Sequence, residues 1–197
     1  MMKTMKAITV WQPWASLLAC GAKKYETRSW PTKYRGPIAI HAAAKRPLRQ
    51  EGMPWEIFDA ITTALAKHYG ACRFDWHLGG TKINHDGTDN GFDIPLGAII
   101  ATAELANCWR IVEHPGTNVD VAKNIPIGAE SMTKDKHAPD FADYFVPTEQ
   151  EMLFGDWTPG RYAWELTNVQ MLPEPIPALG KQGLWNCEMP EVPNEQA

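Results

Sequence analysis

The chain has 197 residues, of which 44% are hydrophobic and 21% are charged, and its formal net charge is −4. This composition is typical of a globular protein and argues against an intrinsically disordered one. The sequence contains no apolar run approaching the length of a membrane-spanning helix, and no secretory signal follows its basic start, so we expect a cytoplasmic protein without membrane contact.

The charge is distributed unevenly along the sequence. Residues 1–50 contain ten Lys and Arg but a single acid, Glu26, whereas residues 51–197 contain nine Lys and Arg and 22 acids. We interpret the basic first quarter as a local anion-binding face. The alternative is a surface whose charges balance after folding, because a block of sequence need not form a patch in space.

Cysteine and histidine spacing does not indicate a metal centre. The four cysteines lie far apart and form no C-x-x-C pair: Cys20, Cys72, Cys108 and Cys187. We therefore expect reduced thiols. Cys72, His77 and His85 match no standard zinc spacing, and we predict neither a metal nor a cofactor.

The first predicted elements are a strand and a short helix. β-Branched residues dominate positions 6–11, which predicts a strand. Pro13 suits the first position of a helix, whose apolar stripe is Trp14, Leu17 and Leu18. Gly21 is placed to close this helix in a left-handed conformation. The helix would deliver the charged residues that follow to a loop or to the start of a strand.

The following elements are a second strand and a longer helix. Residues 37–44 predict a strand with Ile38 and Ile40 on one face and His41 on the other. Residues 54–69 form the strongest amphipathic helix pattern, with Pro54 at its start and a glycine after its end. Residues 79–91 are rich in Gly, Asn and Asp and predict a long exposed loop.

The second half of the chain is dominated by two predicted strands. Residues 95–108 are nearly all apolar except for Glu104, as in a central strand. Residues 113–144 are polar and predict an irregular insertion. Residues 161–172 alternate in polarity and predict another strand, followed by an extended proline segment at 173–177.

These elements predict an α+β fold. We expect a small mixed β-barrel with a helix after the first strand and a helical insertion. The expected organisation is one domain over residues 1–187, with insertions at about 46–95 and 113–157 and a flexible tail at 188–197.

Charged residues gather directly after the first predicted helix. Arg28 offers a planar fork that suits a phosphate or the edge of a base. Lys23 could act as a base if its surroundings favoured the neutral amine, and Glu26 would belong to the same recognition cluster. The structural alternative is a salt-bridged turn.

Two further polar residues interrupt apolar strands. Glu104 is either a solvated strand end or a carboxylate in a barrel mouth, where it could pair with Lys23. His41 is either a hydrogen-bonded histidine of the core or rim, or a ligand contact. Both alternatives stay open at this stage.

Tryptophans near these segments are candidate stacking platforms. Any one of them is better explained as core, but Trp11 and Trp30 flank the charged residues and are favoured for stacking on a base, worth about 1–3 kcal/mol. The candidate catalytic residues are Lys23, Glu26 and Glu104. The candidate substrate-binding residues are Trp11, Gln12, Pro13, Arg28, Trp30, His41, Lys181 and Trp185.

The run G-A-K-K-Y-E-T-R over residues 21–28 resembles the G-x-K-x-x-E-x-R signature of the ASCH domain family. The segments W-Q-P-W-A, G-R-Y-A-W-E-L and G-K-Q-G-L-W are similar to those of bacterial and phage members. The resemblance covers about residues 5–45, 96–112 and 158–187. It implies a fold similar to the PUA domain, a small β-barrel known for RNA binding.

The resemblance also implies a cleft, between the barrel and the first helix, that binds RNA or a modified nucleotide. Some relatives are hydrolases, and one branch deacylates N4-acetylcytidine with a Lys, a Thr and a Glu. Carried over by position, the lysine is Lys23 and the glutamate is Glu104. Glu26 occupies the threonine position, and a carboxylate cannot replace a hydroxyl nucleophile without a change of mechanism.

Three functional hypotheses follow. The first is a module that binds RNA or modified nucleosides. The second is a hydrolase, acting as a ribonuclease or on N4-acylated cytidine. The third is a protein adaptor, which would show an exposed apolar patch on the predicted helix at 54–69.

Overall fold

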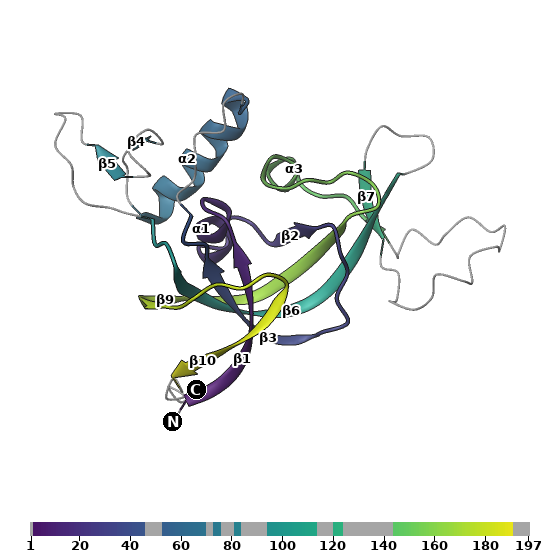
Figure 1. Ribbon diagram of the computed structural model, residues 1–197. Coiled ribbons are helices and arrows are strands. Elements are labelled where there is room, and N and C mark those ends of the chain that lie inside the picture. The colour runs from purple at the N-terminus through teal and green to yellow at the C-terminus, as the bar shows by residue number, and fades with distance from the viewer. Residues whose placement is uncertain are drawn as a thin grey trace.

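The computed structural model describes residues 2–45, 53–69, 73–75, 81–83, 94–113, 120–123 and 144–190. Its centre is a mixed sheet with the strand order β10-β1-β3-β6, and β9 and β2 continue it beyond β6 (Figure 1). The bounds of these strands are β1 (Met2–Val10), β2 (Tyr25–Arg28), β3 (Gly36–Ala42), β6 (Ala98–Glu113), β9 (Tyr162–Pro177) and β10 (Leu184–Pro190). β1 and β3 run parallel, and the other pairs of this sheet run antiparallel.

The long strands β6 and β9 form the curved spine of the sheet (Figure 1). Their register shifts at three places, and such bulges bend a strand and increase its twist. One edge of β6 pairs with β3 and then with β7 (Asp120–Lys123), which pairs with β8 (Tyr144–Phe145). The mixed α+β class is therefore confirmed. The described strands form an open, bent sheet, so the predicted closed barrel is not confirmed.

In the described part of the chain, three helices accompany the sheet: α1 (Trp14–Ala19), α2 (Trp55–Tyr69) and α3 (Glu149–Phe154). Pro13 caps α1 instead of occupying its first position, a difference of one residue from the prediction. Gly21 closes the helix as predicted: its φ is +73°, and its N–H donates to the Leu18 carbonyl at 3.0 Å. No described helix has the length and apolar character needed to cross a membrane.

Strand alternation divides the core into two faces. Ile38 and Ile40 pack with Leu18 of α1 on one face of the sheet. Ala39 packs with Trp185 of β10 on the other face, and the His41 ring lies 5.6 Å from Trp185. The predicted separation of His41 from the two isoleucines is confirmed.

Several segments differ from their predictions. The predicted loop at 79–91 contains β5 (Thr81–Ile83), which pairs with β4 (Arg73–Asp75), and the predicted irregular segment at 113–144 contains β7. Helix α3 was not predicted. β10 extends into the predicted tail as far as Pro190, because its residues pair with the start of β1.

The cysteines that the structure describes are free thiols, as predicted: Cys20, Cys108 and Cys187. The three residues considered for zinc, Cys72, His77 and His85, lie outside the described residues.

Candidate nucleic-acid interface

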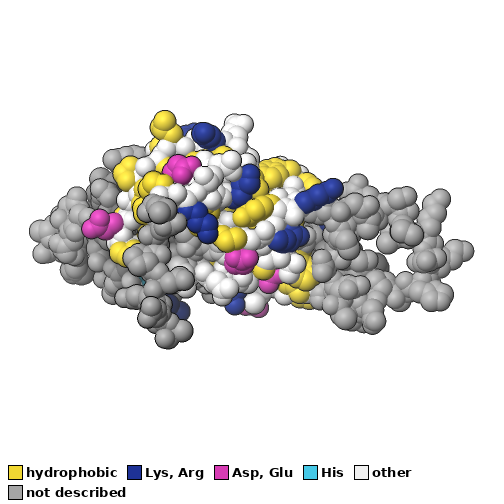
Figure 2. Space-filling model, turned by 90° about the horizontal axis from the view of Figure 1, so that it is seen from below, with side chains coloured by type: hydrophobic (Ala, Val, Ile, Leu, Met, Phe, Trp, Pro, Cys, Tyr) yellow, Lys and Arg dark blue, Asp and Glu magenta, His cyan; other side chains and the backbone are white. Residues whose placement is uncertain are grey.

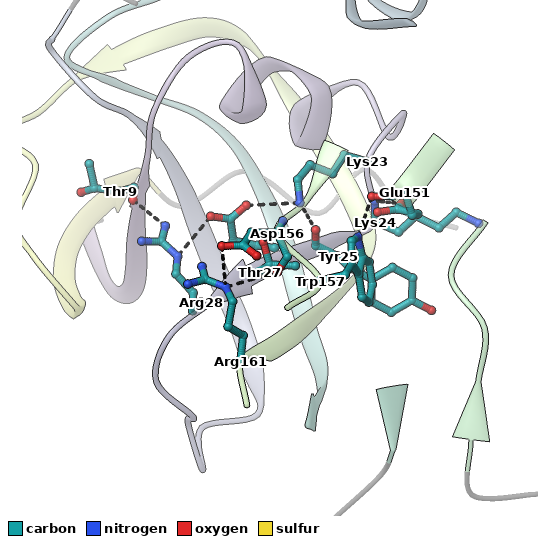
Figure 3. A network of polar contacts seen from close by, with 11 residues as sticks. Thr9, Lys23, Lys24, Tyr25, Thr27, Arg28, Glu151, Asp156, Trp157 and Arg161 are labelled. Atoms are coloured by element: carbon teal, nitrogen blue, oxygen red, sulfur yellow. Dashed lines mark hydrogen bonds and ion pairs between the residues drawn. The ribbon is translucent and has the colours of Figure 1, made fainter. Parts of the chain in front are cut away.

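The charged residues that follow α1 form one connected row. Lys23 Nζ lies 3.4 Å from Glu26 Oε2, and Glu26 Oε1 lies 3.1 Å from Arg28 Nε. Lys23 also donates to the carbonyl oxygen of Tyr25 (Figure 3). We call Lys23, Glu26 and Arg28 the charged row.

Burial differs sharply along the charged row. Lys23 is 1% exposed and Glu26 is 8% exposed, so neither presents much surface to a ligand. The Arg28 side chain is 24% exposed. A buried ammonium needs a carboxylate and further hydrogen bonds to offset its lost hydration, and Glu26 and the Tyr25 carbonyl supply them. Lys23 and Glu26 thus hold Arg28, the member of the row that reaches the surface.

Arg28 connects the charged row to the end of β1. Its Nη2 donates to the Thr9 carbonyl oxygen at 2.7 Å. Nε is buried and ion-paired with Glu26 but makes no hydrogen bond, and Nη1 has no partner among the described residues. The guanidinium therefore keeps one edge available for a phosphate or a base.

Thr9 joins this arginine to the loop before β10. Its hydroxyl donates to the Lys181 carbonyl oxygen at 2.9 Å and accepts from Trp185 Nε1 at 3.1 Å. His41 lies opposite Thr9 in the β1–β3 register. We call Thr9 together with Arg28, His41, Lys181 and Trp185 the Thr9 corner.

His41 is a buried member of the Thr9 corner. It is 1% exposed, its Nε2 lies 3.0 Å from the Ala178 carbonyl oxygen, and its Nδ1 has no hydrogen-bond partner among the described residues. Burial lowers the pKa of His41, and the hydrogen bond to Ala178 opposes that shift in part. This placement matches a core or rim histidine more closely than a direct ligand contact.

Gly180 makes the close packing over His41 possible. A Cβ on Gly180 would lie 2.4 Å from His41 Cε1 and 3.0 Å from the Thr9 hydroxyl oxygen. No side chain fits there unless the loop or the ring moves. The loop over residues 178–183 is therefore seated directly on the Thr9 corner.

The two tryptophans favoured for stacking have different environments. Trp11 is 58% exposed, and Lys45 Nζ lies 5.1 Å from the centre of its ring. Trp30 is half-buried and packs edge-to-face on Trp164 with 4.6 Å between ring centres. Trp11 thus offers an accessible aromatic face, whereas Trp30 packs against the core.

The remaining candidate residues lie apart from the surface of the Thr9 corner. Gln12 is buried, and its side chain bridges the Ser16 N–H and the Pro95 carbonyl oxygen, while Pro13 is buried at the start of α1. Glu104 lies in β6 and makes no ion pair with Lys23 in the described part of the chain. It lies close enough to Tyr34 to raise the pKa of that phenol, after the larger effect of burial.

Basic side chains prevail at the surface of the first quarter of the chain. Its only acid, Glu26, is buried and paired internally. Arg28 pairs with Glu26. Among the described residues, no acid forms an ion pair with the other exposed or half-buried basic side chains of this region, which are Lys3, Lys6, Lys24, Lys33, Arg35 and Lys45. Figure 2 shows Lys and Arg side chains interspersed with hydrophobic ones, and with some Asp and Glu, across the described part of the lower face.

Sequence reasoning missed the residues that support this arrangement. Thr9 reads as an ordinary strand residue, and only its three contacts identify it as the centre of the corner. Gln150 and Glu151 of α3 contact the segment that carries the charged row, and nothing in their local sequence indicates this. The role of Gly180 could have been suspected from the sequence, because Gly180 and Gly183 lie on either side of Lys181.

Comparison with known proteins assigns this sequence to a family. Residues 8–175 match the ASCH domain. The chain belongs to the ASCH domain family. Activating signal cointegrator 1 from Homo sapiens is 54% identical over 44 residues, and the Mus musculus protein of the same name is 52% identical over 44 residues. Each match covers 22% of this chain and 8% of the relative, so the chain spans a small part of these proteins.

Proposed function

We propose that this ASCH domain binds single-stranded RNA or unpaired modified nucleotides at the Thr9 corner. The observation that carries the proposal is the placement of the charged side chains of residues 1–50. Their single acid is buried in the charged row, while Arg28 keeps a free guanidinium edge at the surface. A polyanion would therefore meet positive charge there without a competing carboxylate from this region.

The neighbouring groups suit an unpaired nucleotide. Trp11 offers an exposed ring on which a base can stack, a contact tolerant of sequence. Lys45 lies over that ring, and Lys181 lies 6.0 Å from the ring centre of Trp185. In the proposed complex these ammonium groups contact phosphates, and Arg28 contacts a phosphate or a base edge.

The test is the salt dependence of RNA affinity. Fluorescence anisotropy of a labelled single-stranded RNA gives the dissociation constant at several salt concentrations. Arg28→Ala should weaken binding and lower the log–log salt slope by about 0.7, the value for one phosphate contact on a single strand. Lys67→Ala removes the same charge from an exposed position on α2 and serves as the matched control.

The same preparations test the hydrolase alternative. The wild type could hydrolyse an N4-acylated cytidine or cleave the RNA, and a folded Lys23→Ala variant could lose that activity. This result would show that the protein is a hydrolase rather than a binding module. Equal RNA affinities and salt slopes for the wild type and Arg28→Ala would refute the Thr9 corner as the binding surface.

A further inference from the structure

The segment 150–157, at the end of what the sequence showed only as an insertion, lies along residues 22–27. Gln150 Nε2 donates to the Ala22 carbonyl oxygen at 2.7 Å. Glu151 Oε1 accepts from the Lys24 N–H at 2.6 Å. These two consecutive residues of α3 thus hold the backbone on both sides of Lys23. We call this pair of hydrogen bonds the α3 clamp.

The same segment continues along β2 beyond the α3 clamp. The Trp157 ring packs edge-to-face on Tyr25, with 5.9 Å between ring centres. The Asp156 N–H donates to the Thr27 hydroxyl oxygen at 3.0 Å. A Cβ on Gly155 would lie 2.8 Å from Trp157 Nε1 and 3.0 Å from Thr27 Cγ2, so the two segments are in close contact (Figure 3).

The two sets of contacts alternate within β2, where segment 150–157 contacts the side chains of Tyr25 and Thr27 and the charged row uses Glu26 and Arg28. Segment 150–157 holds residues 22, 24, 25 and 27, whereas the charged row uses Lys23, Glu26 and Arg28. Successive side chains of a strand point to opposite faces, so contacts on one face can fix the residues that emerge on the other. The segment that carries Arg28 is thus held by a helix more than 120 residues away in the sequence.

Glu151 makes the clamp at an energetic cost. The residue is 5% exposed, and its Oε2 is buried with no hydrogen-bond partner among the described residues. Burial raises the pKa of the carboxyl, while the Lys24 N–H, Lys23, the Tyr25 N–H and Lys24 act in the opposite direction. A leucine or methionine would fill this place without an unpaired oxygen, but it could not accept the Lys24 N–H.

We propose that Gln150 and Glu151 are positioning residues that fix the charged row, and through it the Arg28 edge that meets the nucleic acid. The proposal rests on the proposed function for its consequence in RNA binding. Its structural part, the hold on Arg28, can be measured without RNA.

The variants separate position from charge. Gln150→Ala removes one hydrogen bond from an exposed residue, and Glu151→Ala removes the other. Glu151→Gln keeps an oxygen for the Lys24 N–H but removes the charge. Glu149→Ala removes a neighbouring exposed charge that makes no clamp contact and is the control. Thermal unfolding monitored by circular dichroism identifies the temperature range in which each variant is folded.

The first readout is the Arg28 Nε–H signal in NMR. In the wild type Arg28 Nε is buried and lies 3.1 Å from Glu26 Oε1, so its proton should exchange slowly with water. Gln150→Ala and Glu151→Ala should accelerate its exchange, while Glu151→Gln and Glu149→Ala should leave it unchanged. Unchanged exchange in both clamp variants would overturn the proposal, and Gln150→Ala decides the matter if Glu151→Ala fails to fold.

The second readout is RNA affinity in a double-mutant cycle with Arg28→Ala. Loss of either clamp bond should weaken binding roughly 2- to 10-fold, within the coupling expected for residues of one network. This loss should vanish in the Arg28→Ala background, because the clamp acts through Arg28. Equal losses in both backgrounds would overturn the proposal. Unaltered RNA binding in Arg28→Ala alone would instead refute the proposed function, and the Arg28 Nε–H signal would then decide the clamp.

Discussion

The substitution of Lys23 has the most clearly defined expected effect on stability. This residue was a candidate catalytic lysine in the sequence, but in the structure its side chain is buried, with 1% exposure. Lys23→Met keeps most of the aliphatic stem and removes the ammonium. The Tyr25 carbonyl then loses its donor, and Glu26 keeps Arg28 as its remaining ion-pair partner.

The cost follows from these two losses. A buried carbonyl left without a donor costs about 1–3 kcal/mol. Breaking a buried ion pair costs about 3–5 kcal/mol when the remaining charge is unpaired, and the retained Arg28 contact at 3.1 Å places this case well below that range. We expect a combined loss of about 2–4 kcal/mol in the free energy of unfolding. For a chain of this size, that corresponds to a fall in Tm of roughly 4–16 °C.

Urea denaturation followed by tryptophan fluorescence measures this loss. Lys24→Met is the matched control, since Lys24 is adjacent and exposed, and its unfolding free energy should stay within about 0.5 kcal/mol of the wild type. If Lys23→Met were as stable as Lys24→Met, Lys23 would not support the fold and the interpretation of the charged row would be wrong.

Three further predictions concern the Thr9 corner. Gly180→Ala should lower the free energy of unfolding by about 1–3 kcal/mol in urea denaturation, because its Cβ would overlap His41. Leu179→Ala, at an exposed neighbouring position, should leave this free energy unchanged. Equal stability of the two variants would contradict the packing of Gly180 on His41. Since the folded pKa of His41 is lowered, the unfolded chain takes up the proton first, so stability should fall as pH drops below about 6.5, by at most about 1.4 kcal/mol per pH unit. Urea midpoints measured at several pH values should fall more steeply with decreasing pH in the wild type than in His41→Gln. The same dependence on pH in both proteins would contradict the prediction. Trp11→Ala should weaken RNA binding roughly 5- to 150-fold in anisotropy titrations, the equivalent of one lost stacking contact, whereas Trp55→Ala on α2 should leave affinity unchanged; equal effects would argue against stacking at Trp11.

Local signals in the sequence predicted the framework of the site. The apolar stripe of α1 and the closing glycine placed the charged residues directly after a short helix, and the structure has this arrangement. Alternation along β3 placed His41 on the face opposite Ile38 and Ile40. These features depend on residues within a few positions of one another, which is why pattern and periodicity suffice.

Features that depend on distant contacts escaped prediction. Helix α3 has six residues, too few for a periodic signal, and its contacts with the signature span more than 120 positions. Lys23 reads as one charged residue among several, and its burial becomes visible only when Glu26 and the Tyr25 carbonyl are placed around it. The open curvature of the sheet comes from register shifts between β6 and β9, which pairing decides and composition does not reveal.

Whether RNA contacts the Thr9 corner can be measured by ultraviolet crosslinking of the full chain to a short single-stranded RNA, followed by mass spectrometry of the attached peptides. If RNA binds there, crosslinks should appear at Trp11 and in the loop over residues 178–183, and both should be reduced in Arg28→Ala. Crosslinks confined to α2, or equal in Arg28→Ala and the wild type, would contradict binding at this corner.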